Sequence, residues 1–109
     1  MKDKNVVVDM RLTPAVAQQR IRALAQDGGN VIWGAHVLER MDQRGLLRQD
    51  VLRVLRNGYV DDRPTKTEFD EWKCKITLKI RGARVAGVVV IILLGGKLFP
   101  KTVEWEDGK

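Results

Sequence analysis

The pattern of apolar and polar residues changes its period near residue 58. Before that point, apolar residues recur every three or four positions, which is typical of helices that bury one face. Three stretches show this spacing, residues 13–29, 31–45 and 46–58, and each ends at a glycine. We therefore expect three consecutive helices in the first half of the chain, the second one beginning after a short apolar entry.

Beyond residue 58 the pattern indicates strands. Residues 71–81 alternate between apolar side chains and lysine, threonine or arginine. Residues 85–94 are apolar at almost every position, which predicts a central strand covered on both faces, or a strand at a dimer contact. Residues 97–105 return as another strand, in which Pro100 marks an edge or a bulge. Residues 6–9 are expected to form a short edge strand or a loosely held arm.

This order of elements predicts an α+β fold, with two or three N-terminal helices packed on one face of a three- to four-stranded antiparallel sheet. The other face can stay in contact with water and carry the lysine row. A chain of 109 residues is long enough for one core and too short for two. We expect one compact domain, in which residues 1–29 form an N-terminal arm and helix and residues 30–106 form the α+β unit.

The charge balance favours a polyanionic partner. The formal net charge is +6, and both halves of the chain carry an excess of lysine and arginine. The single cysteine, Cys74, excludes an intrachain disulfide and fits the reducing cytoplasm. We find no signal-peptide pattern, and the longest apolar run is too short to span a bilayer, so no membrane association is expected. With one histidine and one cysteine, a zinc site has too few ligands, and we expect no metal and no cofactor.

The only histidine lies in a conspicuous position on the second predicted helix. His36, Arg40 and Arg44 are four positions apart, so they form a single row beside the apolar face made by Val37 and Met41. Such a row is expected at the rim of a cleft. Its positive charges repel each other, and a phosphate would offset that repulsion. Arginine grips phosphate oxygens bidentately, and histidine transfers protons near neutral pH.

This combination is what a metal-independent ribonuclease needs. A base removes the proton of the ribose 2′-hydroxyl, the oxygen attacks the adjacent phosphorus, and cationic donors stabilise the added charge. The spacing also allows a plainer interpretation. His36 would then be a hydrogen-bonded residue at a helix start, and the two arginines would pair with Asp42, Asp50 or a strand carboxylate.

Residues 35–58, AHVLERMDQRGLLRQDVLRVLRNG, resemble a small bacterial family known as domain-of-unknown-function family 4258. Its signature joins a histidine to Glu-Arg-Met, then Arg-Gly-Leu, Asp-Val and a closing Asn-Gly. Residues 72–92 and 101–105 resemble its sheet, so the likeness covers roughly residues 30–106. Leu47 stands where the family often has a serine or threonine cap.

The resemblance implies a relation to the barnase–EndoU–colicin–RelE group of RNase folds, which includes many toxins. It implies His36 as general acid or base and Arg40 and Arg44 as phosphate binders. Thr102 is implied as a neighbour of the site. Two further residues, Lys73 and Lys75, would add cationic contacts to RNA from the exposed face of their strand.

These observations favour a small metal-independent endoribonuclease or RNase-like toxin whose partner is RNA. One alternative is a non-catalytic nucleic-acid binder, with residues 40–58 as a helix–turn–helix that presents Arg48, Arg53 and Arg56. Another is an interaction protein, such as an antitoxin or immunity partner, or a homodimer built on residues 88–94.

Overall fold

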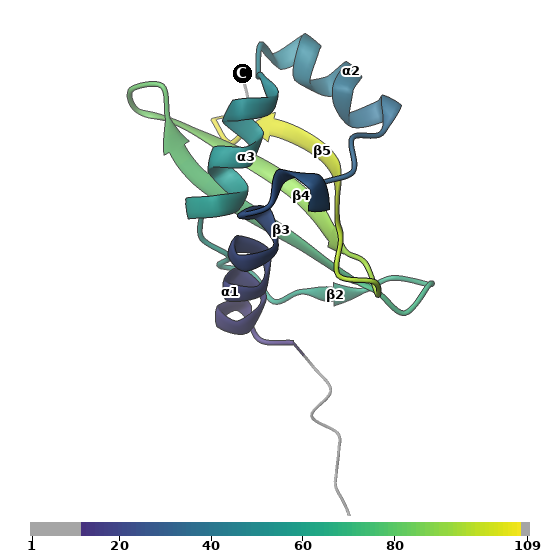
Figure 1. Cartoon of the computed structure of the whole chain (residues 1–109). Helices are drawn as coiled ribbons and strands as arrows, with labels where there is room; N and C mark the ends of the chain where they lie inside the picture. Colours follow the sequence, from purple (N-terminus) through teal and green to yellow (C-terminus); the bar gives the residue numbers. More distant parts are fainter. Residues whose placement is uncertain (1–11, 108–109) are drawn as a thin grey trace, which may run out of the picture.

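The computed structural model describes residues 12–107, in which helices precede a sheet, as the periodicity predicts (Figure 1). Three helices and a four-stranded antiparallel sheet confirm the α+β class. The strand or arm expected at residues 6–9 lies outside the described residues. In chain order the elements are α1 (Pro14–Ala25), the 3-10 turn η2 (Gly28–Asn30), α2 (Ala35–Arg44), α3 (Arg48–Asn57), β2 (Thr65–Lys66), β3 (Trp72–Ile80), β4 (Arg84–Ile92) and β5 (Leu98–Trp105).

The sheet has the order β2-β3-β4-β5, with every neighbouring pair antiparallel. Its side chains alternate between a face that packs on the helices and an open face. On the helix face, Ile76, Val88 and Val103 lie side by side across three strands, and each is at most 1% exposed. This row forms the middle of the core.

Strand β4 is central, but the helices cover only one of its faces. Val89 and Ile91 point to the open face and are half-buried. The prediction of a strand covered on both faces is therefore wrong for this chain. Lysine stems supply part of the missing cover, since a Cβ at Gly87 would lie 3.1 Å from Cε of Lys75.

Strand β5 is an edge strand with a bulge, as Pro100 predicted. Pro100 pairs with Val90 and Thr102 with Val89, so Lys101 is an extra residue between two paired positions. Outside the start of β5, the backbone N–H of Ile32 donates to the carbonyl of Leu98 at 2.9 Å. The segment before α2 therefore runs along the outer side of this edge.

Helices α1 and α3 cap each other at their C-terminal ends. The guanidinium of Arg22 donates to the carbonyls of Asn57, at 3.0 Å, and Gly58, at 2.6 and 2.9 Å. In return, Nε of Arg56 donates to the carbonyl of Ala25 at 2.7 Å. Each arginine thus satisfies carbonyls that the other helix leaves without an intrahelical partner.

The first helix belongs to the same core as the rest of the domain. Ile21 of α1, Leu55 of α3 and Leu98 of β5 are all completely buried in a single hydrophobic cluster. Residues 14–25 therefore pack as part of the same domain as the sheet.

Candidate functional site

Helix α2 presents the basic row beside its buried face. It starts after Gly34 without a side-chain cap and ends at Gly45, whose φ of 69° terminates it in the left-handed region. Val37 is 1% exposed, whereas His36 is exposed and Arg40 is half-buried. The row thus flanks the buried face, as its spacing predicted.

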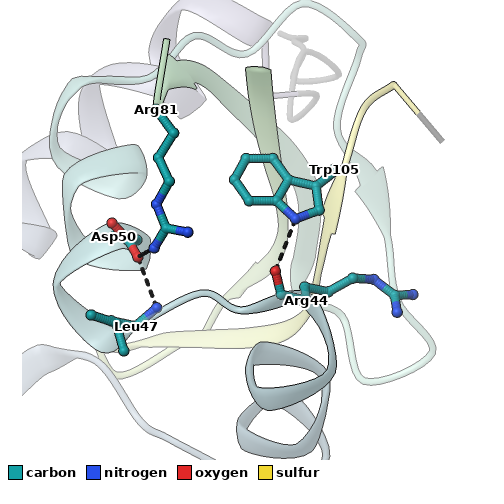
Figure 2. A network of polar contacts seen from close by, with 5 residues as sticks. All are labelled: Arg44, Leu47, Asp50, Arg81 and Trp105. Carbon is teal, nitrogen blue, oxygen red and sulfur yellow. Dashed lines mark hydrogen bonds and ion pairs between the residues drawn. The ribbon is translucent and has the colours of Figure 1, made fainter. Parts of the chain in front are cut away.

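Helix α2 lies along strand β5 and runs in the same direction. At its start, a Cβ on Gly34 would lie only 3.3 Å from Cε1 of Phe99. At its end, Nε1 of Trp105 donates to the backbone carbonyl of Arg44 at 2.9 Å (Figure 2). Contacts at both ends fix the helix beside the edge strand over its full length.

This arrangement places the basic row along the length of β5. Helix α2 advances about 1.5 Å per residue and β5 about 3.3 Å. Arg40 lies between the two ends of the helix, and Thr102 lies midway between Phe99 and Trp105 on β5. His36 is correspondingly near the Phe99 end and Arg44 near the Trp105 end.

The electrostatics of Glu104 show which way the end of the row faces. Its pKa is lowered, first by a hydrogen bond from Lys75 and also by the charge of Arg44. Glu104 lies on the open-face side of β5, and the charge of Arg44 acts on it from the end of α2. Figure 2 shows its guanidinium directed away from the indole of Trp105. Among the carboxylates considered for the arginines, the strand carboxylate Glu104 is the one whose pKa the charge of Arg44 lowers.

Lys75 is engaged by two carboxylates. Its Nζ lies 2.9 Å from an oxygen of Glu104 and 2.8 Å from one of Glu106. The hydrogen bond with Glu106 is the main cause that raises the pKa of Lys75. Lys75 is therefore less available to RNA than its exposed strand position suggested. Lys73, one row further along the same face, is exposed.

Asp50 does not pair with the basic row. One of its carboxylate oxygens accepts from Arg81 at 2.6 Å and from the backbone N–H of Leu47 at 2.8 Å (Figure 2). Asp50 thereby caps the N-terminus of α3, because the apolar side chain of the N-cap residue Leu47 cannot accept a hydrogen bond. Arg40 donates to the amide oxygen of Gln43 at 2.7 Å, within its own helix.

A hollow of about 450 Å³ adjoins the Arg44 end of the row. Arg84 enters it as a second guanidinium, bound by Asp107 at 2.9 and 3.2 Å and placed 4.0 Å above the Trp105 ring. The cleft therefore lies at the opposite end of α2 from His36. Sequence reasoning missed Arg84, because only the strand pairing brings it to the end of α2. The lining residues are Gln43, Arg44, Arg84, Trp105 and Asp107.

Over residues 12–107, no group of three or more histidine, cysteine, aspartate or glutamate residues is placed to hold a metal ion. Cys74 is buried, and burial raises the pKa of its thiol to about 11, so it is an inert thiol at neutral pH. No helix within the same range has the length and apolar character needed to cross a bilayer.

The fold and the row define an α+β domain that carries a basic helix along the edge strand of its sheet. The chain belongs to the domain of unknown function family DUF4258, whose family profile matches residues 33–93. The match contains His36, Arg40 and Arg44 but ends before β5, so Thr102 lies outside it. Neither the curated proteins nor the solved structures showed a significant match to the chain.

Proposed function

We propose that this protein is a small metal-independent endoribonuclease, of the kind that acts as an RNase toxin. The observation that carries the proposal is the row of His36, Arg40 and Arg44 on the helix that lies along the edge strand β5. It offers a proton-transfer group and two guanidinium groups on one accessible strip. We propose with it that the domain is related to the barnase–EndoU–colicin–RelE group of RNase folds.

In the proposed reaction, His36 accepts the proton of the ribose 2′-hydroxyl. The 2′ oxygen attacks phosphorus, the bond to the 5′ oxygen breaks, and the imidazolium returns a proton to that leaving oxygen. Arg40 and Arg44 bind the phosphate and stabilise the charge that grows on it. The products are a 2′,3′-cyclic phosphate and a 5′-hydroxyl. Thr102 would contribute its hydroxyl as a hydrogen-bonding neighbour.

The helix–turn–helix alternative has less support from the contacts of α3. Arg48 lies 5.4 Å above the Trp33 ring, and Arg56 donates to the carbonyl of Ala25. Two of the three arginines offered for DNA contact therefore already have intramolecular contacts. The third, Arg53, is exposed.

The proposed partners follow from the chemistry of the row. RNA is the substrate, and the cytoplasm is where the protein would meet it. An antitoxin or immunity protein would inhibit the toxin by placing carboxylates over the three cationic positions. A homodimer built on residues 88–94 would use the open face of β4, because β3 and β5 occupy both of its edges.

The test is cleavage of a 5′-labelled RNA by purified protein in EDTA. We expect wild-type protein to cleave, and His36→Ala to be at least about 100-fold slower, as is typical for loss of a general base. Arg53→Ala, which removes an exposed helical arginine elsewhere, should retain activity. Circular dichroism confirms that each variant is folded. Folded wild-type protein that does not cleave, or His36→Ala that cleaves equally well, would contradict the proposal.

A further inference from the structure

A second hollow, of about 330 Å³, lies on the open face of the sheet, away from the helices. It is bounded by the turn between β2 and β3, by the middle of the sheet and by the bulge of β5. Its lining residues are Lys66, Thr67, Glu68, Phe69, Lys73, Ile91 and Lys101. The lining thus combines lysines with an aromatic and a branched apolar side chain.

Two of its lysines are available to an anion. Lys73 and Lys101 are exposed, and neither forms an ion pair within residues 12–107. Lys101 is the bulged residue of β5, which explains why a strand that otherwise alternates regularly presents a lysine here. Lys66 is different, because it pairs with Asp70 at 3.2 Å and lies 4.5 Å above the Trp72 ring.

The aromatic side chain is displayed by an ordered turn. Phe69 is 70% exposed, which is unusual for so large an apolar group. The hydroxyl of Thr67 accepts from the backbone N–H groups of Phe69 and Glu71, both at 3.2 Å. Asp70, with a φ of 63°, completes the turn. The backbone under the exposed ring is therefore held in one conformation before any ligand arrives.

We propose that this hollow binds an unpaired nucleotide of the RNA that lies beyond the two nucleotides flanking the cleaved bond. The base stacks on Phe69 over the floor formed by Ile91, and Lys73 and Lys101 bind the flanking phosphates. Aromatic rings flanked by cations are the usual platform for single-stranded nucleic acid. Glu68, the carboxylate in the lining, disfavours phosphate on its own side of the hollow.

The position of the hollow fits a strand of RNA that also contacts the basic row. Lys101 is the bulged residue of the edge strand β5, along which helix α2 carries the row. A chain held at the row would cross β5 at this point and reach the hollow. This assignment of RNA as the ligand rests on the proposed function.

The first test measures RNA binding in the His36→Ala background, where no substrate is consumed. A fluorescein-labelled ten-nucleotide single-stranded RNA is titrated in EDTA and followed by anisotropy. We expect Phe69→Ala to weaken binding at least about fivefold, and Phe69→Tyr, which keeps the ring, to restore it. Because Phe69 is exposed, these variants should fold as the parent does.

The cations are tested by the salt dependence of the same titration. Replacing both Lys73 and Lys101 by alanine should lower the slope of log affinity against log salt by about 1.4, near 0.7 for each lost phosphate contact. Lys79→Ala removes an exposed lysine from the same strand face outside the hollow, and it should change affinity less than Lys101→Ala.

Cleavage separates this inference from the proposed function. A dinucleotide bound at the basic row is too short to reach the hollow as well. The variant Phe69→Ala, made in otherwise wild-type protein, should therefore cleave a dinucleotide at the wild-type rate. It should cleave longer RNA more slowly than wild-type protein does. If wild-type protein cleaves nothing and Phe69→Ala still weakens binding, the hollow is confirmed and the ribonuclease proposal fails. The inference would be overturned if the Phe69 and lysine variants bound RNA with wild-type affinity. It would also be overturned if these substitutions abolished self-association of the protein and left RNA binding unchanged.

Discussion

At the scale of single residues, Glu104 sets the electrostatics of the candidate site. It forms an ion pair with Lys75 at 2.9 Å, and the charge of Arg44 contributes to lowering its pKa. Both cations were expected to face RNA. One carboxylate therefore reduces the positive potential that two residues present at the edge of the sheet.

We predict that Glu104→Gln binds single-stranded RNA more tightly than wild-type protein. The substitution removes a negative charge that competes with phosphate for Arg44 and Lys75, and about a threefold gain is expected for an exposed charge of this kind. Anisotropy titration measures it, with Asp62→Asn as the control at another exposed carboxylate. An equal gain in both variants would point to net charge alone.

The same residue predicts how stability depends on pH. Because the pKa of Glu104 is lowered on folding, its contribution is fully present above its usual value of 4.5 and is lost as pH falls through the lowered pKa. Its exposed position limits that contribution to about 1 kcal/mol or less. Urea unfolding at pH 7 and pH 3 should show a smaller acid loss for Glu104→Gln than for wild-type protein. Equal losses would mean that the ion pair adds nothing to folding.

The residues of the row were predictable because they lie on one helix. The spacing of His36, Arg40 and Arg44 and the helix period were enough to place them on one side. Their surroundings were not predictable, since Glu104, Arg84 and Trp105 reach α2 only through strand pairing. The engagement of Lys75 by two carboxylates is likewise a property of the sheet, and its sequence position showed only that it faces outward.

At the scale of secondary-structure elements, the backbone at the end of α3 packs closely against strand β3. A Cβ at Gly58 would lie 2.5 Å from the carbonyl oxygen of Val54 and 2.8 Å from both Cγ1 of Ile76 and the carbonyl oxygen of Thr77. The next residue, Tyr59, pairs with Thr77 through hydrogen bonds of 2.8 and 3.0 Å. This close approach gives a physical reason for the glycine that closes the family signature.

We predict that Gly58→Ala destabilises the protein by about 2–3 kcal/mol, because backbone atoms that cannot move aside occupy the space of the new methyl group. Gly95→Ala is the matched control, since nothing lies within 4 Å of its Cβ position, and it should change stability by less than about 0.5 kcal/mol. Urea unfolding measures both. Similar stability of the two variants would contradict the packing described here.

The elements were predicted well where the local pattern determines them. Three helices ending near glycines and strands with a period of two follow directly from the spacing of apolar residues. The exposed face of β4 was not predicted, because an apolar run does not reveal how many layers will cover it. Val89 and Ile91 remain half-buried with no helix over them.

At the scale of the whole molecule, the helix side and the open face of the sheet carry different groups of residues. The helices on one side supply the core and, through α2, the basic row. The other side carries the lysines and the displayed ring of Phe69. Part of the positive charge therefore lies along one edge, where α2 carries Arg40 and Arg44 and β5 carries the bulged Lys101. This edge is where a single-stranded polyanion would lie.

The most direct test of the central claim uses one RNA in two forms, in EDTA. The second form carries a 2′-deoxy nucleotide at the site where the first is cut. The account predicts that wild-type protein cleaves the first to a 2′,3′-cyclic phosphate and leaves the second intact, and that His36→Ala cleaves neither. Cleavage of the deoxy form at the same position, or no cleavage of either form by folded wild-type protein, would contradict it.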